Sequence, residues 1–489
     1  MHLPGWAGSQ ATLDQSCEAP RVRLTGLDTA FLCLDRDVSP MHLGALAIFR
    51  PVHLDDPGRL AAVLADRAQC LPQLCQRVQP SEFPLAAAVW VDDPGFCAKD
   101  HIELHSLDCP GGPDCRDSAA ELAVELMIRP MQRNRPLWEF HVISGLEGGR
   151  FAVLFKMHHA FCDGLSALEI GLRVVDEVKP RGGGARRSGT TDDRWPLSTQ
   201  RSVQSRLWRV PGDLRDAVGS VAVQMSQATR IATSVLRRVR LPFPASPLVT
   251  MSSGRRTLTM ARLDLPQVRR IRAHYGGTVN DVLLAVVTGG LREWLVTRGH
   301  PVEGLILRAF IPVSQRARSR NRTGGNRLSG YLCDLPVGEP DPGKRLLTIR
   351  RAMDQSKAAG ADSGPGAIPV LADRLPPAVH RVAAPVAGQG ASLLFDLMVT
   401  SIPVPSMPFT LDGAELEEVF PIAPLAAGQA LVVGLSWYQD TAYIALHADR
   451  EALPDAQRLA EAMQPAVVVL NDLVERAHRV ASATSGECR

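Results

Sequence analysis

Two adjacent histidines, His158 and His159, begin a run of seven residues that reads His-His-Ala-Phe-Cys-Asp-Gly and ends at Gly164. Imidazole has a pKa of about 6.5, so a histidine can accept the proton of a hydroxyl group at neutral pH. We predict that His159 is such a general base and that His158 helps to hold its ring in one orientation. A histidine pair taken alone is more often structural or a weak metal site, so the prediction depends on the whole run.

The end of this run suits the start of a helix. Asp163 can accept hydrogen bonds from main-chain amides as a helix cap, and Gly164 allows close packing of the main chain. We therefore interpret Asp163 as a structural residue rather than as part of a charge relay. Cys162 lies inside the run, and we expect its side chain to pack in the turn rather than to act as a nucleophile.

The elements around the run are predicted by residue periodicity. Residues 151–157 read as a strand that leads into His158, and residues 164–178 have apolar positions at helical spacing. Residues 137–143 read as a second strand, and the glycine-rich turn at residues 145–149 predicts an antiparallel hairpin between the two strands. The histidines are thus expected at a strand-to-helix junction.

Strand and helix patterns alternate along the rest of the chain, which indicates a mixed α/β fold. A chain of 489 residues is too long for one compact core, so two large units that share a face are expected. We expect further strands at residues 41–50, 86–91, 257–265, 305–313, 328–335, 395–401, 430–438 and 442–448, and further helices at residues 59–70, 118–128, 266–274, 279–297 and 455–477.

Composition divides the chain into three parts. Residues 22–178 form a predicted N-terminal subdomain that carries the histidine run, and residues 256–480 form a predicted C-terminal subdomain. Residues 179–255 begin with a stretch rich in Gly, Arg, Ser and Thr, which predicts a flexible linker. A basic, amphipathic helix is expected next, at residues 206–240. It either binds anionic lipid or is a solvated helix packed on the domain seam.

Bulk composition excludes several classes of protein. The 54 lysines and arginines nearly balance the 51 aspartates and glutamates, so the overall charge does not indicate nucleic-acid binding. The ten cysteines lack metal-binding or disulfide spacing, and we expect neither a bound metal nor a disulfide framework. The sequence contains no signal-peptide pattern and no uninterrupted apolar run of about 18 residues. We therefore expect a cytoplasmic protein.

Several motifs together resemble the bacterial wax ester synthase/diacylglycerol acyltransferase family, within the superfamily of chloramphenicol acetyltransferase and peptide-synthetase condensation domains. The histidine run resembles the active-site signature of that superfamily. The resemblance covers nearly all of the chain from Leu24 to about Ala477. The narrower family is indicated by the segments at residues 24–32 (LTGLDTAFL), 41–44 (MHLG), 135–138 (RPLW), 278–285 (TVNDVLLA) and 325–327 (GNR).

This resemblance implies a fold and a site. The fold would consist of two chloramphenicol acetyltransferase-like subdomains, each built on a mixed sheet, with an active-site tunnel between them and the histidines at its middle. Asn280, Asp281 and Asn326 would line the tunnel opposite the histidines and bind substrate. Because Asn280 and Asp281 open an apolar helix, they are equally well interpreted as helix-capping residues.

The same resemblance implies the reaction. An acyl-CoA thioester and a lipid alcohol, such as diacylglycerol or a long-chain alcohol, would enter from opposite sides of the tunnel. Transfer would be direct, without a covalent acyl-enzyme and without a cofactor other than acyl-CoA as substrate. Because such alcohols reside in membranes and lipid droplets, we expect the protein to associate with the inner face of the plasma membrane or with lipid-droplet surfaces.

One segment departs from the family pattern. The family commonly has Ser-Asn-x-Pro-Gly-Pro where this chain has Thr-Ser-Ile-Pro-Val-Pro at residues 400–405. We expect this change to affect the preference for the acceptor or the acyl chain. Two alternatives stay open: an acyltransferase that acts on a polyketide or glycolipid hydroxyl, and a protein that binds acyl lipids without catalysis.

Overall fold

The structure is a computed structural model that describes most of the chain. Residues 179–245 of the predicted linker segment, which include the basic helix at residues 206–240, lie outside the described part, whereas residues 246–255 are described and Leu248 packs in the core of the second half. The described residues are 22–51, 56–81, 87–108, 115–177, 246–314, 326, 328–360, 366–375, 379–381 and 391–486.

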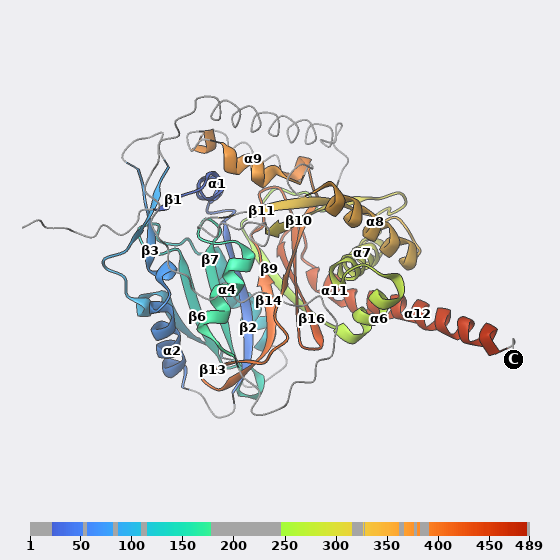
Figure 1. Cartoon of the computed structure of the whole chain (residues 1–489), viewed down its shortest axis with the longest axis horizontal. Helices are drawn as coiled ribbons and strands as arrows, with labels where there is room; N and C mark the ends of the chain where they lie inside the picture. Colours follow the sequence, from blue (N-terminus) through green and yellow to red (C-terminus); the bar gives the residue numbers. More distant parts are fainter. Residues whose placement is uncertain are drawn as a thin grey trace, which may run out of the picture.

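The first sheet belongs to the half of the molecule that carries the histidine run (Figure 1). Within the described residues it has seven strands, in the spatial order β5-β6-β7-β2-β14-β13-β8. β6 and β7 pair antiparallel, so the predicted hairpin is confirmed, and the edge strand β5 pairs parallel with β6. The bounds are β2 (His42–Arg50), β5 (Ile102–Ser106), β6 (Trp138–Ser144), β7 (Phe151–His158), β8 (Asp176–Glu177), β13 (Phe409–Leu411) and β14 (Ala414–Ile422).

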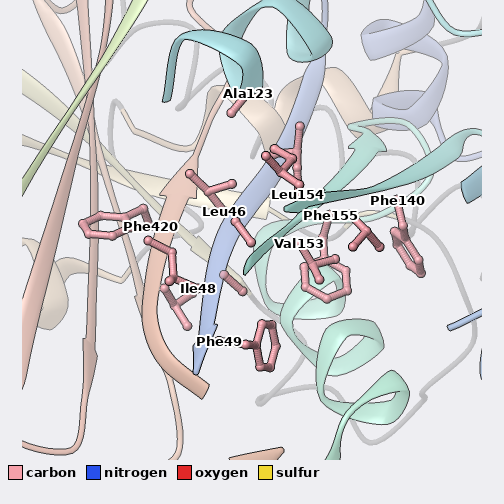
Figure 2. Close-up of a cluster of buried hydrophobic side chains, with 14 of the residues drawn as sticks. Leu46, Ile48, Phe49, Ala123, Phe140, Val153, Leu154, Phe155 and Phe420 are labelled. Atoms are coloured by element: carbon pink, nitrogen blue, oxygen red, sulfur yellow. The ribbon is translucent and has the colours of Figure 1, made fainter. Parts of the chain in front are cut away.

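Helices cover both faces of this sheet. Figure 2 shows Leu46 of β2 and Leu154 of β7 pointing toward Ala123 of α3, while α4 lies on the opposite side of the strands. The side chains on both sides are fully buried, which places the core of this half within the sheet and its two helical layers. The elements of this half are α1 (Gly26–Leu34), α2 (Pro57–Gln69), α3 (Cys115–Ile128), α4 (Gly164–Val174) and a small sheet of β1 (Val22–Arg23), β4 (Val89–Asp92) and β3 (Gln76–Gln79).

The second sheet forms the other half of the molecule. Within the described residues it has six strands, in the order β11-β10-β12-β15-β16-β9. Its strands are β9 (Arg256–Asp264), β10 (Leu307–Ser314), β11 (Leu328–Leu335), β12 (Leu397–Pro403), β15 (Leu431–Tyr438) and β16 (Thr441–Asp449). Its helices are α6 (Leu265–Tyr275), α7 (Val279–Thr297), α8 (Pro342–Ala359), α9 (Ile368–Arg374), α11 (Ala456–Glu461) and α12 (Met463–Gly486). Among the described residues, no helix combines the length and the apolar character that a membrane span requires.

One segment from the C-terminal part of the sequence belongs to the first sheet. β13 and β14 come from the C-terminal part of the sequence but pair in the first sheet, where β14 runs antiparallel to β2. The assignment of residues 256–480 to a C-terminal subdomain therefore does not hold for this segment. Three glutamates interrupt the apolar pattern of β14, so the sequence pattern does not predict this strand. One of them, Glu418, is nevertheless buried, because it forms ion pairs with Arg262 of β9 and Arg116 of α3.

Most of the other predicted elements are present within a few residues of their expected bounds. The helix at residues 279–297 and the strand at residues 328–335 have the predicted bounds. The predicted closing helix is broken into α11 and α12, because Pro465 lacks an amide hydrogen and its ring clashes with the carbonyl four residues earlier. The sequence pattern does not predict α8 or β5, since polar and charged residues interrupt their apolar positions.

The two sheets come close where β14 passes β15. A Cβ atom added to Gly434 of β15 would lie 2.2 Å from the main-chain carbonyl oxygen of Pro421 in β14. Van der Waals repulsion excludes such a distance, so only glycine lets the two main chains approach this closely. Gly434 thus sets the spacing between the sheets at this point.

Gly434→Ala is expected to lower the free energy of unfolding by about 1–3 kcal/mol, because the main chain of one sheet must move to admit the methyl group. Gly171→Ala in α4 is the matched control. Nothing lies within 4 Å of the Cβ atom added there, and alanine stabilises a helix relative to glycine by about 0.5–1 kcal/mol. Urea unfolding of both variants, followed by circular dichroism, measures the difference. A Gly434→Ala variant as stable as the wild type would contradict the close approach.

Candidate active site

A cavity of about 1360 Å³ lies between the two halves. Its walls come from β2, β7 and β14 of the first sheet, from β10, β11 and β12 of the second, and from α1, α4 and α9. Most of the lining side chains are apolar, and in the described chain the lining includes only two side chains with a permanent charge, Arg36 and Lys357. The volume exceeds the roughly 300–1,000 Å³ of ordinary small-molecule pockets, so the cavity has room for more than one apolar chain.

The predicted strand-to-helix junction is confirmed, because β7 ends at His158 and α4 begins at Gly164. Asp163 is the N-cap of α4. Its Oδ1 atom accepts hydrogen bonds from the main-chain amide of Ser166 at 2.8 Å and from the Ser166 hydroxyl at 2.6 Å. Its Oδ2 atom accepts a hydrogen bond from the Ser314 hydroxyl of β10 at 3.2 Å. Asp163 thus holds the start of α4 and connects it to the second half.

The main chain of His159 is held from two sides. Its amide donates a hydrogen bond to the carbonyl oxygen of Met41 at 2.7 Å, and its carbonyl oxygen accepts one from the side-chain amide of Asn326 at 2.5 Å. The imidazole ring stacks on Phe31 of α1, with the ring centroids 4.0 Å apart. The ring lines the cavity while its Nδ1 atom is buried, which leaves Nε2 as the ring nitrogen on the cavity side.

Burial gives this ring unusual electrostatics. It lowers the pKa of His159 from the ordinary 6.5 to about 4, because the protein interior disfavours the charged imidazolium. The neighbouring His158 lowers the pKa further, whereas the carbonyl of His159 itself and the carboxylate of Asp163 oppose the shift. The ring is therefore neutral near pH 7, and a neutral imidazole has a lone pair that can accept a proton.

His158 is buried and does not line the cavity. Its Nδ1 atom accepts a hydrogen bond from the main-chain amide of Ala160 at 3.0 Å, so the ring proton resides on Nε2. Nε2 lies 3.4 Å from Oδ2 of Asp35. Burial would raise the pKa of Asp35, but His158 and the amide of Met41 hold that pKa well below its usual range. His158 thus anchors the turn from behind the cavity wall.

Asn326 connects His159 to helix α1. Its Nδ2 atom donates to the His159 carbonyl and, at 2.7 Å, to Oδ1 of Asp28. Asp28 is fully buried, and its Oδ2 atom accepts a hydrogen bond from the amide of Thr25 at the start of α1. Asn326 is also buried and lies outside the cavity wall, so it supports His159 instead of lining the tunnel as the family resemblance implies. Sequence reasoning misses Asp28, because its spacing from Thr25 is typical of a capping box.

Asn280 and Asp281 occupy different environments. Asn280 lines the cavity, and its Oδ1 atom accepts a hydrogen bond from the Ser401 hydroxyl. Asp281 is buried outside the cavity wall, and its Oδ2 atom accepts a hydrogen bond from the amide of Thr278 at 2.8 Å. Thr278, rather than either of them, is the N-cap of α7. Asp281 therefore holds the start of the helix, and Asn280 is the member of the pair that a ligand can reach.

The segment that departs from the family pattern forms part of the cavity wall. Residues 400–403 end β12, and residues 400–404 line the cavity. Ile402 lies against the start of α4, since a Cβ atom added to Gly164 would be 3.3 Å from its Cδ1 atom. The altered side chains are therefore in direct contact with the space that a ligand would occupy.

Comparison with known proteins identifies the family. Residues 24–283 match the wax ester synthase/diacylglycerol acyltransferase catalytic domain, and residues 324–470 match the WS/DGAT C-terminal domain. The chain belongs to the wax ester synthase/diacylglycerol acyltransferase family. A protein of Mycobacterium tuberculosis named as a probable diacylglycerol O-acyltransferase is 31% identical to it over 464 residues, which cover 93% of this chain and 96% of the relative.

Solved structures agree with this assignment. The wax ester synthase/diacylglycerol acyltransferase from Marinobacter aquaeolei matches with a TM-score of 0.64 at 25% identity, covering 93% of this chain and 100% of that one. The first condensation domain of the calcium-dependent antibiotic synthetase matches with a TM-score of 0.56 at 16% identity, over 94% and 97% of the two chains, and shares the fold. This member of the WS/DGAT family is therefore an acyltransferase with the predicted chloramphenicol acetyltransferase-like fold.

Asn326→Ala is expected to lower kcat for acyl transfer by about tenfold to a hundredfold, because the imidazole of His159 loses the group that fixes its main chain. KM for acyl-CoA should change little, since Asn326 does not line the cavity. Asn471→Ala is the matched control, because Asn471 is a buried asparagine whose partners, Arg270 and Glu475, lie outside the site. Steady-state kinetics and melting temperatures of both variants distinguish a role of Asn326 in positioning His159 from a role in stability alone. A loss of stability with unchanged kcat would make Asn326 merely structural.

Proposed function

We propose that this WS/DGAT family member transfers a fatty acyl group from acyl-CoA to the hydroxyl of diacylglycerol or a long-chain alcohol, with His159 as the general base. The products would be triacylglycerol and wax ester. One observation carries the proposal: the neutral imidazole of His159 lines a large apolar cavity that both halves of the molecule enclose. The names of the M. tuberculosis and Marinobacter relatives support the same substrates.

The mechanism follows from the position of the ring nitrogens. Nε2 of His159 would take the proton of the acceptor hydroxyl while the alcohol oxygen attacks the thioester carbonyl. The tetrahedral intermediate would then collapse, the carbon–sulfur bond would break, and the CoA thiolate would take the proton back from the imidazolium. The ester and free CoA thiol are the products, and the imidazole returns to its neutral state.

Direct transfer is supported by the environment of Cys162. Its side chain is buried, and its sulfur lies 3.4 Å from the sulfur of Met157. Cys162 is not part of the cavity wall, so its thiol does not face the space in which a thioester would be attacked. A nucleophile must contact the carbonyl carbon, and the described thiol of the histidine run is not positioned to do so.

The lining of the cavity favours apolar acceptors over a glycolipid. A sugar headgroup needs several polar partners, because a buried hydroxyl without a hydrogen bond is costly. The wall formed by α4, β2 and β12 instead presents mostly aliphatic and aromatic side chains, including Leu168, Phe49 and Met398. Long hydrocarbon chains, one on the acyl donor and one or two on the acceptor, match this surface better than a polar acceptor does.

The acceptor also suggests where the protein acts. Diacylglycerol and long-chain alcohols partition into membranes and lipid droplets, so an enzyme that uses them must draw them from such a surface. We propose peripheral association with the inner face of the plasma membrane or with lipid droplets. Flotation of the purified protein with phosphatidylglycerol vesicles would test this association separately from catalysis.

His159→Ala is expected to lower acyl transfer by about two to four orders of magnitude, because it removes the general base. The assay follows release of CoA thiol from palmitoyl-CoA with dioleoylglycerol or hexadecanol as acceptor, and mass spectrometry identifies the ester. His300→Ala, at an exposed histidine far along the chain, is the control for loss of an imidazole. Full turnover in His159→Ala would reject the assignment of the base. Palmitoyl-CoA binding without ester formation by the wild type would instead identify a lipid-binding protein without catalytic activity.

The pH profile should report the low pKa of His159. The base is protonated only as pH falls toward about 4, so log kcat/KM should stay level between pH 7 and 5 and fall below that range. An acidic limb centred near pH 6.5 would contradict the burial argument.

Brief pH-jump assays are needed, because the buried His42 and His447 also have pKa values of about 4. The unfolded state therefore takes up more protons than the native state between pH 6.5 and 4, and stability declines as pH falls through that window.

A further inference from the structure

A second cluster of chemically active side chains lies at the edge of the first sheet, away from the cavity. Glu103 and His105 belong to the edge strand β5, and His141 belongs to β6. One donor atom from each residue lies within 4.8 Å of the donor atoms of the other two. None of these residues lines the cavity, so the acyl-transfer site does not account for their proximity.

The pairing of the two strands explains how these residues meet. β5 and β6 run parallel, with Glu103 opposite His141. Glu103 and His105 are two residues apart in the strand, so their side chains point to the same face of the sheet. His141 is opposite Leu154 of β7, which points toward α3 (Figure 2), so the cluster is on the face that looks away from the cavity. Residues far apart in the sequence thus become neighbours on one surface.

The three donor atoms form a nearly equilateral triangle. Nε2 of His105 lies 3.2 Å from Nδ1 of His141, and Oε2 of Glu103 lies 3.5 Å from each of these nitrogens. Ligand atoms about 2.0–2.1 Å from a tetrahedral zinc ion are about 3.3 Å apart, whereas octahedral neighbours at the same bond length are about 2.9 Å apart. We propose that Glu103, His105 and His141 bind one Zn²⁺ ion, with water as the fourth ligand.

The neighbours of His141 favour the ring tautomer that a metal ligand needs. Its side chain is 2% exposed, and its Nε2 atom faces Oε2 of Glu139 at 3.4 Å. Glu139 is held in turn by Lys156, whose Nζ atom lies 2.7 Å from the same oxygen. A carboxylate beside Nε2 favours the tautomer with its proton there, which leaves the lone pair of Nδ1 directed at the cluster. Metal-binding histidines are commonly oriented by a carboxylate in this way.

The donor set also selects the class of metal ion. Two imidazole nitrogens and one carboxylate oxygen suit zinc and its transition-metal neighbours, whereas calcium and magnesium prefer oxygen ligands alone. Glu103 is 54% exposed and His105 is 18% exposed, so water can reach the fourth coordination position. Arg129 is 4.0 Å from Glu103 and is itself more than half exposed, so its side chain can move away as the ion binds. The ion would fasten the edge strand β5 to β6.

The test uses the full chain after removal of any affinity tag and treatment with a chelator. Calorimetric titration with Zn²⁺ is expected to give one ion per chain, with a rise in melting temperature, and Co²⁺ should give the visible absorption of a tetrahedral site. His105→Ala should abolish this binding, and Glu103→Gln should weaken it by about tenfold or more. His300→Ala, a control for adventitious imidazole binding at an exposed position, should bind as the wild type does.

Two outcomes would overturn the zinc site. One is the absence of saturable one-to-one binding by the wild-type chain. The other is a His105→Ala or Glu103→Gln variant that binds Zn²⁺ as tightly as the wild type, since the ion would then lie elsewhere. Circular dichroism of the metal-free variants checks that the fold is intact, and the half-exposed Glu103 provides an independent test if His105→Ala alters folding. Both outcomes are independent of acyl transfer, because neither side chain lines the cavity.

Discussion

The position of the proposed base depends on the two hydrogen bonds that hold the main chain of His159. Met41 supplies the acceptor on one side and Asn326 the donor on the other. Because Asn326 lies next to strand β11 of the second sheet, the turn is complete only when both halves are assembled. Asp28 fixes Asn326 and also caps α1, the helix whose Phe31 stacks on the imidazole. One buried carboxylate therefore couples the ring, the turn and the junction between the halves.

Burial has two opposite effects on the proposed base. An apolar cavity keeps the imidazole of His159 neutral over a wide pH range, so a lone pair is always available near pH 7. The same environment makes the imidazolium less favourable than in water. The developing oxyanion of the tetrahedral intermediate and the carboxylate of Asp163 would offset that charge, because electrostatic interactions are strong where water is excluded. Enclosure between two sheets thus suits a reaction that creates both charges together.

The two faces of the first sheet have different chemical characters. In β7, Phe155 points to the cavity, whereas its neighbour Lys156 points to the opposite face and pairs with Glu139. The pleat of a strand alternates side chains in this way, so one strand can form an apolar ligand wall and a buried polar network at once. The network continues to His141 and the edge of the sheet, where the polar groups approach solvent. The sheet therefore separates the proposed zinc site from the proposed acyl-transfer site.

The sequence by itself determines the local features of this protein. The histidine run between a strand pattern and a helix pattern predicts the junction at His158, and apolar periodicity predicts α7 with its bounds, because both depend on neighbours within a few turns of chain. Pairing between segments that are far apart in the sequence cannot be predicted from such local patterns. The sequence does not predict β14, because its glutamates interrupt the apolar pattern, and Glu418 can be buried only because Arg262 and Arg116 pair with it in the folded structure. Only the tertiary structure brings Asn326 next to His159. It likewise brings His105 of β5 next to His141 of β6, because strand order and register depend on packing of the whole chain.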